Sequence, residues 1–307
     1  MAFMLYLAGG YASEVETQLL DMGVNRLYSQ LNDRKLGERW LEYNKNVAPR
    51  NILVDSGAYS AHTKGKVVDV DDYIAYVNAN QGAFQGIAQL DTIPGKLGVP
   101  KTLRELAEAP EQSWQNYLYM RQHVKDVECL IPVFHQGEDF KHLNRLLEWT
   151  DEKGNHIPYI GISPANDVAL KFRDSWMSVV FHHIKKSSNP NVKTHGFGVT
   201  SFNILQKYPL YSADSTSWIM ASANGGVITQ WGVITVSDNQ LDNPKHVSHL
   251  PEDRQEMLEQ QLMKFGVTLD QCRVDYKSRG IYNARYLMDW AKNYTFKGNN
   301  TYQKKLF

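Results

Sequence analysis

The chain has 307 residues, with 33 Lys and Arg against 33 Asp and Glu, and its two cysteines lie far apart in the sequence. The balanced charge gives no global sign of a nucleic-acid partner, and the cysteines argue against a disulfide framework and for a reducing, cytoplasmic compartment. No apolar run approaches the length of a membrane span, and the first residues lack the basic region of a signal peptide, so no membrane partner is expected.

Strand-like and helix-like segments alternate through the first 214 residues. Apolar runs predict strands at 3–8, 26–30, 51–54, 86–90, 129–134, 158–162, 195–199 and 210–213. Periodicity and capping signals predict helices at 13–22, 37–44, 70–80, 113–124, 139–149 and 167–186, and a short helix between Ser201 and Pro209. Ser13 and Glu16 have the spacing of a capping box at the start of the first helix.

Eight strands with helical connections favour an α/β fold in which a parallel sheet closes into a (β/α)8 barrel of the TIM type. A doubly wound open sheet is the alternative, but no G-x-G-x-x-G motif follows the first strand. After residue 214 the pattern changes to two β-prone pieces within 225–236, a polar loop, and helices at 251–265 and 281–293. We therefore divide the chain into a catalytic barrel, residues 1–236, and a C-terminal helical and β appendage, residues 237–307.

The end of the chain is basic. From Lys264 onward there are nine Lys or Arg against three Asp, a local charge of +6. Such a segment could bind phosphates, or it could be only a solvated surface.

Three of the predicted strands end in aspartate, at Asp55, Asp91 and Asp214. A parallel barrel places the carboxyl ends of its strands around one pocket, where catalytic residues collect. Each Asp could instead cap the helix or turn that follows it. Three such residues in one chain favour a common site with acid, base and nucleophile roles.

Six short stretches between about residues 50 and 220 strengthen this interpretation. They are DSGAYS at 55–60, LD at 90–91, FHQG at 134–137, IGI at 160–162, GFGV at 196–199 and ADS at 213–215. In this order they resemble the motifs of the tRNA-guanine transglycosylases (queuine and archaeosine tRNA-ribosyltransferases). The family's zinc site of three Cys and one His is not matched, because Cys272 stands alone. With the short chain, this departure looks like the phage and bacterial branch that places 7-deazaguanines into DNA.

The resemblance implies that guanine is exchanged for a 7-deazaguanine base, such as 7-cyano-7-deazaguanine, without a cofactor or metal. Asp214 matches the family's nucleophile, which would hold the sugar covalently as a retaining glycosidase does. Asp55 would be the general acid or base that moves protons on the two bases. The protein would then act in the cytoplasm, or in the host cytoplasm if it is encoded by a phage.

The resemblance also implies residues that bind the base. Asp91 would accept hydrogen bonds from N1–H and the 2-amino group, and Gln136 would donate to the 6-oxo group. The other implied contacts are Gly161, which lets the backbone approach the base edge, polar contacts from Ser56 and Gly57, and stacking by Tyr59 and Phe197 on opposite faces of the ring.

Taken alone, several of these residues have plain structural explanations. Tyr59 and Phe197 could be core aromatics, Gln136 could belong to a helix-entry turn, and Gly161 could be a strand glycine that allows close packing. We interpret His135 as a satisfied core histidine and leave it out of the site. Two pairs of histidines are not favoured as metal ligands. His182 and His183 are neighbours on a helix and cannot face one site, and His246 and His249 lie in a polar loop with no obvious further ligands.

The polymer is predicted to be DNA, with tRNA as the alternative. A guanine in duplex DNA would have to leave the stack. Trp218, Trp231 and the basic tail, including Lys277 and Arg279, are candidates to contact it. Other functions left open are a non-catalytic, nucleic-acid-binding member of the family and an unrelated barrel hydrolase that uses the same carboxylates.

Overall fold

The structure is a computed structural model that describes residues 3–44, 50–96, 99–165, 168–294 and 296. Within this part of the chain, nine parallel strands form one sheet in the order β5-β4-β3-β2-β1-β9-β8-β7-β6. The strands are β1 (Met4–Ala8), β2 (Arg26–Ser29), β3 (Ile52–Asp55), β4 (Phe84–Ala88), β5 (Leu130–Ile131), β6 (Val133–His135), β7 (Tyr159–Ser163), β8 (Lys193–Gly196) and β9 (Ser212–Ser215).

Strands β5 and β6 are two halves of one barrel stave, separated by Pro132 alone. Proline has no N–H to give to a ladder, so the pairing is interrupted there. Strand β5 pairs with β4 and β6 pairs with β7, while the carbonyl of Pro132 accepts a 2.7 Å hydrogen bond from the Gly161 N–H. The sheet therefore closes as eight staves, and the predicted TIM-type (β/α)8 barrel is confirmed.

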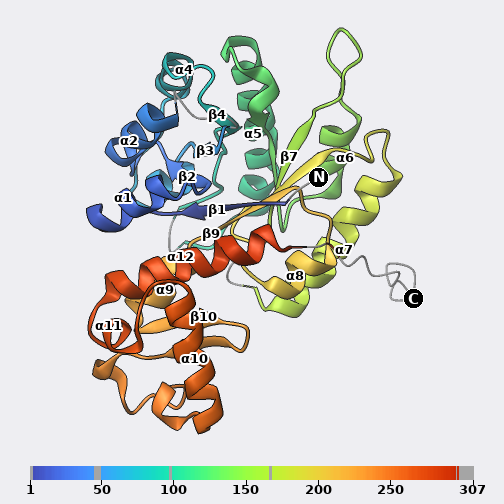
Figure 1. Cartoon of the computed structure of the whole chain (residues 1–307). Coiled ribbons are helices and arrows are strands. Elements are labelled where there is room, and N and C mark those ends of the chain that lie inside the picture. The colour runs from blue at the N-terminus through green and yellow to red at the C-terminus, as the bar shows by residue number, and fades with distance from the viewer. Residues whose placement is uncertain (1–2, 45–49, 97–98, 166–167, 295, 297–307) are drawn as a thin grey trace.

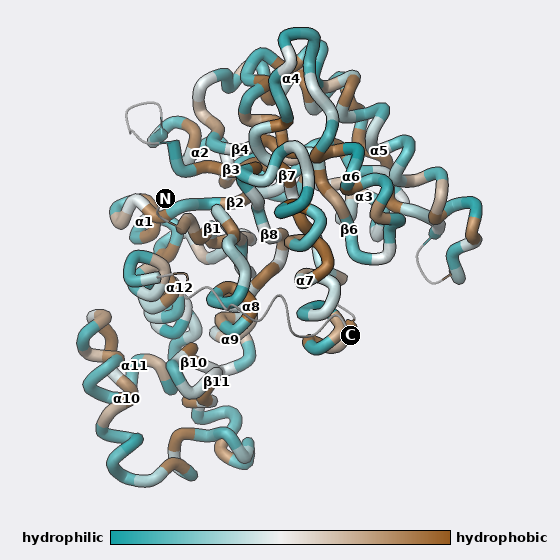
Figure 2. Tube along the Cα trace, turned by 90° about the vertical axis from the view of Figure 1, so that its right-hand side faces the viewer, coloured by the Kyte–Doolittle hydropathy of each residue, from teal (hydrophilic) through white to brown (hydrophobic). Residues whose placement is uncertain are grey.

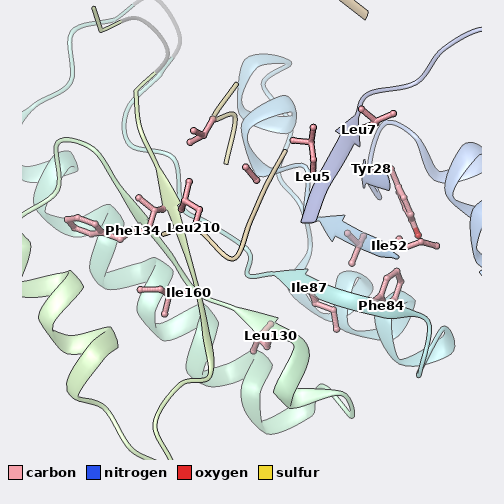
Figure 3. Close-up of a cluster of buried hydrophobic side chains, with 14 of the residues drawn as sticks. Leu5, Leu7, Tyr28, Ile52, Phe84, Ile87, Leu130, Phe134, Ile160 and Leu210 are labelled. Carbon is pink, nitrogen blue, oxygen red and sulfur yellow. The ribbon is translucent and has the colours of Figure 1, made fainter. Parts of the chain in front are cut away.

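Helices surround the sheet, as Figure 1 shows. Those of the barrel are α1 (Ser13–Asp21), α2 (Arg34–Asn44), α3 (Ala58–Thr63), α4 (Val70–Ala79), α5 (Leu103–His123), α6 (Phe140–Glu148), α7 (Leu170–Lys186), α8 (Phe202–Lys207) and α9 (Ser217–Ala223). Apolar strand residues such as Leu5, Ile52 and Ile160 belong to the main hydrophobic cluster, part of which Figure 3 shows. The same cluster includes apolar residues of the surrounding helices. Because successive strand residues face opposite sides, a second cluster that includes Tyr6 and Leu53 fills the barrel interior.

The N-terminal caps of α1 and α5 differ from the prediction. Helix α1 has no side-chain cap, because Ala12 and not Ser13 is its N-cap residue. The buried Glu16 carboxylate accepts from the Tyr11 N–H and binds Arg26 at 2.9 Å. Helix α5 begins ten residues earlier than predicted, with a capping box formed by Thr102 and Glu105, and Pro110 lies inside it. A strong cap and a packed face therefore outweigh the one hydrogen bond that the proline removes. The predicted start of α7 at residue 167 lies outside the described residues.

The chain beyond α9 forms a separate lobe and then returns to the barrel. The lobe contains β10 (Gly226–Thr229), β11 (Gly232–Thr235), α10 (Glu252–Lys264) and α11 (Leu269–Val274), and it projects away from the barrel in Figures 1 and 2. The hairpin within 226–235 shares one hydrophobic cluster with α10 and α11. The lobe is thus an excursion between α9 and the final helix.

The final helix, α12 (Tyr276–Lys292), belongs to both parts of the molecule. Ile281, Ala284 and Leu287 join the barrel cluster, and the helix lies against β1 and α9. On its other side, Tyr282 joins the cluster of the lobe. Helix α12 therefore packs on the barrel beside α9 and joins the barrel to the lobe. In the described part of the chain no helix is both long and apolar enough to cross a membrane.

Candidate active site

The three predicted aspartates lie at the carboxyl ends of their strands. Asp55 is the last residue of β3, Asp214 is the third residue of β9, and Asp91 follows the end of β4 by three residues. This is the face of a (β/α)8 barrel on which its active sites are built.

The pKa of Asp55 is affected by both of the other carboxylates. Burial is the main reason that the pKa of Asp55 rises from 3.8 to about 6. The negative charges of Asp91 and, more weakly, of Asp214 raise it further, while the backbone N–H groups of Gly57 and Ser56 oppose the shift. Because charge effects weaken with distance, the influence of Asp91 and Asp214 on Asp55 means that the three carboxyls are neighbours at this end of the barrel.

Asp91 is held by two side chains, one on each of its oxygens. Gln89 Nε2 donates to Oδ1 at 2.6 Å, and His135 Nε2 lies 3.3 Å from Oδ2. The other ring nitrogen of His135 lies 3.1 Å from Glu138 Oε1. His135 is thus clamped between two carboxylates, and its side chain is 31% exposed. The interpretation of His135 as a core histidine is wrong.

The clamp changes the charge of His135. Burial alone would lower the pKa of the imidazole, but the charges and hydrogen bonds of Asp91 and Glu138 outweigh it and raise the pKa to about 10. His135 is therefore an imidazolium at neutral pH. It balances Asp91 and keeps that carboxylate in place as an acceptor.

Asp214 is held in drier surroundings. Its Oδ2 accepts a hydrogen bond from the backbone N–H of Gly198 at 2.8 Å and lies 3.3 Å from His195 Nε2. His195 is fully buried, and its Nδ1 lies 2.6 Å from Ser212 Oγ, which also contacts the hydroxyl of Tyr159. A chain of polar groups inside the barrel therefore ends on one oxygen of Asp214.

Gln136 and Gly161 have defined places beside this site. The Gln136 Oε1 accepts a hydrogen bond from the N–H of Ala165 at 3.1 Å, which leaves the Nε2 hydrogens for the predicted contact with a 6-oxo group. A Cβ on Gly161 would lie 2.5 Å from the ring of Phe197. The absent side chain thus makes room for the ring of Phe197. That ring also packs edge-on against His195, with 4.4 Å between the two ring centroids.

The residues after β3 turn sharply into α3. Gly57 has φ +81°, and a Cβ there would lie 2.6 Å from Ser29 Oγ, so this turn requires glycine. Ser56 is buried, and its hydroxyl accepts a hydrogen bond from the N–H of Ala58. Tyr59 is 68% exposed, so it is not a core aromatic and its ring is accessible for stacking.

An open groove of about 490 Å³ lies between the loops that follow β1 and β2. Its lining includes Tyr11, Leu31 and Arg34 but none of the three aspartates. Leu31 borders the turn at Gly57, so the groove flanks the carboxylates rather than containing them. In the described part of the chain, no three His, Cys, Asp or Glu side chains are grouped as a metal site.

Two of the residues proposed to contact a nucleic acid are used inside the protein. Trp218 is fully buried and donates its indole N–H to the carbonyl of Ala8. Arg279 is also buried and donates to backbone carbonyls of Ser222 and Cys272, which ties the lobe to α9. These two expectations are wrong, because Trp218 lies in the barrel core and Arg279 lies in the packed junction between barrel and lobe.

Lys277 and Trp231, two other candidates for contact with a nucleic acid, are less buried than Trp218 and Arg279. Lys277 is half-buried and pairs with Glu14 at 3.2 Å. Trp231 is half-buried beside Arg254 on the hairpin of the lobe. The predicted cations Lys297, Lys304 and Lys305 lie outside the described residues.

The sequence interpretation missed the partners of the aspartates, which are Gln89, Glu138, His195, Ser212 and Tyr159. One signal for them exists. Ser212 and Asp214 are two residues apart on one strand and so face the same side, and His195 lies opposite Ser212 in the neighbouring strand.

Comparison with known proteins gives this chain no family. No family model matches it, and no curated protein sequence matches it. Its function is therefore inferred from the geometry of the site and from the motifs that hold it.

Proposed function

We propose that the protein is a guanine transglycosylase, a pentosyltransferase that exchanges guanine in DNA for a 7-deazaguanine base. The observation that supports this most is the meeting of Asp55, Asp91 and Asp214 at one end of the barrel, with the pKa of Asp55 raised to about 6. One carboxyl that is readily protonated beside others held as acceptors supplies the acid, base and nucleophile that base exchange needs.

Asp214 would be the nucleophile. An electron pair of its carboxylate forms a bond to C1′, and the N-glycosidic bond breaks with its electron pair leaving on guanine. Two donors fix the orientation of the carboxylate. The covalent ester would preserve the sugar until the second base arrives, as in retaining glycosidases.

Asp55 would move the protons. In its protonated form it gives a proton to the departing guanine, and as a carboxylate it takes the N9 proton of the incoming base. That base then attacks C1′ and releases Asp214. A pKa of about 6 lets one group serve in both steps near neutral pH.

Asp91 would recognise the base, with its carboxylate accepting from N1–H and the 2-amino group. Gln89 and His135 hold it in one orientation, so the remaining lone pairs have fixed directions. Gln136 would donate to the 6-oxo group, and Tyr59, exposed beside the site, would stack on the ring.

The test is to incubate the protein with labelled 7-cyano-7-deazaguanine and one polymer at a time. The polymers are duplex DNA, single-stranded DNA and tRNA. We expect label in DNA without a matching number of abasic sites. Label in tRNA alone would show that the polymer is tRNA. Abasic sites without label would show a hydrolase, and binding without either product would show a non-catalytic protein.

A further inference from the structure

We infer that His195 is a positioning residue that binds one oxygen of Asp214 and leaves the other to attack the sugar. The inference rests on the proposed function. The Nε2 of His195 and the N–H of Gly198 both reach Oδ2, at 3.3 and 2.8 Å. Oδ1 is then the oxygen that forms the bond to C1′.

The chain of hydroxyls behind His195 sets its tautomer. A carboxylate oxygen can only accept, so Nε2 must carry a proton that it donates to Oδ2. The Nδ1 then accepts from the hydroxyl of Ser212 at 2.6 Å, and Ser212 accepts from the hydroxyl of Tyr159. The opposite order would place two lone pairs against each other between Nε2 and Oδ2. All of these groups are buried, so water does not compete with the chain.

The contact on Oδ2 favours one state of the reaction over the other. When Oδ1 attacks C1′, the glycosidic electron pair leaves with guanine, Asp55 supplies its proton, and Oδ2 becomes the carbonyl oxygen of an ester. Hydrogen bonds to a charged acceptor are about twice as strong as those to a neutral one. The donors from His195 and Gly198 therefore stabilise the free carboxylate more than the ester, and they favour transfer of the sugar to the incoming base.

Loss of this donor should leave the enzyme attached to the sugar. The experiment uses the full-length protein, an oligonucleotide that contains guanine, and then excess 7-cyano-7-deazaguanine. The measured quantities are the fraction of protein in covalent adduct and the rate at which the added base discharges it. In His195→Leu we expect discharge to be slower by about 10-fold to 100-fold, because a hydrogen bond to a charged group is lost, and the adduct fraction to rise.

His195→Gln restores a donor near the position of Nε2 and should recover most of the discharge rate. Ser212→Ala removes a single oxygen, so it tests the relay even if His195→Leu does not fold, and we expect the same direction with a smaller change. The matched control is His246→Gln. His246 is also buried and bonded through Nδ1 to a serine, Ser248, but it lies in the lobe. An adduct fraction in His195→Leu that is unchanged or lower, with discharge unchanged, would overturn the inference.

Nitrogen-15 NMR of the histidine rings separates failure of the inference from failure of the proposed function. We expect the Nε2–H tautomer at His195 in the wild type and a mixture in Ser212→Ala. If the wild type forms no adduct, the proposed function fails, and the tautomer alone decides whether the relay holds Asp214. An Nδ1–H tautomer at His195 would refute the relay whatever the activity.

Discussion

Two histidines flank the carboxylates of the site, and their surroundings differ. His135 is partly exposed and lies between Asp91 and Glu138, which raise its pKa to about 10. His195 is fully buried and lies between one carboxylate, that of Asp214, and a chain of hydroxyls. The first is a cation balanced by two anions near solvent, whereas the second is one link in a chain of polar groups in the dry interior.

The difference suggests a division of the site into two rims. The rim around Asp91 carries fixed charges and can bind the polar edge of a base without burying an unpaired ion. The rim around Asp214 holds one carboxylate by directed donors, as bond formation at a defined oxygen requires. The charges of Asp91 and Asp214 both raise the pKa of Asp55.

Asp91→Asn should remove the recognition rim while leaving the nucleophile intact. If Asp91 accepts from the 2-amino group as proposed, wild-type protein should incorporate labelled guanine over hypoxanthine, which lacks that group, by about 100-fold or more. The variant should lose most of this preference, and competition between the two bases measures it. Asp69→Asn, which changes a helix-capping carboxylate at α4, is the control. Equal preference in wild type and Asp91→Asn would place recognition elsewhere.

Asp55→Asn should change stability in a pH-dependent way. The folded protein raises the pKa of Asp55 from 3.8 to about 6, so it favours the protonated carboxyl. The resulting stability is fully present below pH 3.8 and is lost as pH rises through about 6, to a total of up to about 3 kcal/mol. Asp55→Asn should therefore be more stable than wild type at pH 8 but not at pH 4. Urea unfolding at both pH values tests this, and a difference independent of pH would contradict it.

His135→Gln should have the smallest effect on the free energy of unfolding. This effect should change with pH over a higher range than that of Asp55→Asn. The raised pKa of His135 gives stability that is fully present below pH 6.5 and is lost as pH rises through about 10. Partial exposure of the ring limits the contribution to about 1–2 kcal/mol. The variant should thus be less stable than wild type at pH 6.5 and nearly equal to it above pH 10, as measured by urea unfolding. His123→Gln, at an exposed position on α5, is the control for replacing a histidine by glutamine.

The sequence predicted the barrel and the three aspartates because both follow from local patterns. Apolar runs such as the one ending at Asp55 identify strands, and parallel strands must bring their carboxyl ends together. The partners of the aspartates depend on contacts between staves, which no local pattern records. His195 contacts Asp214 only because of the register between β8 and β9. In that register His195 lies opposite Ser212, which is 17 residues later in the sequence.

The same reason explains the predictions that failed. The spacing of Ser13 and Glu16 predicts a capping box, but the helix begins at Ser13 itself, and the Glu16 carboxylate pairs with the buried Arg26. The basic segment predicts that Arg279 is a cation free to bind phosphate. In the structure Arg279 instead donates to two backbone carbonyls at the junction with the lobe. Charged residues in a sequence show their sign but not the groups that neutralise them.

The most direct test of the account is peptide mapping of the protein after it has been trapped on a guanine-containing oligonucleotide. We predict a glycosyl adduct on Asp214 in wild type and in Asp139→Ala, which removes only a helix cap at α6, and no adduct in Asp214→Ala. An adduct that persists in Asp214→Ala, or that maps to another residue in the wild type, would contradict the assignment of the nucleophile and with it the proposed chemistry.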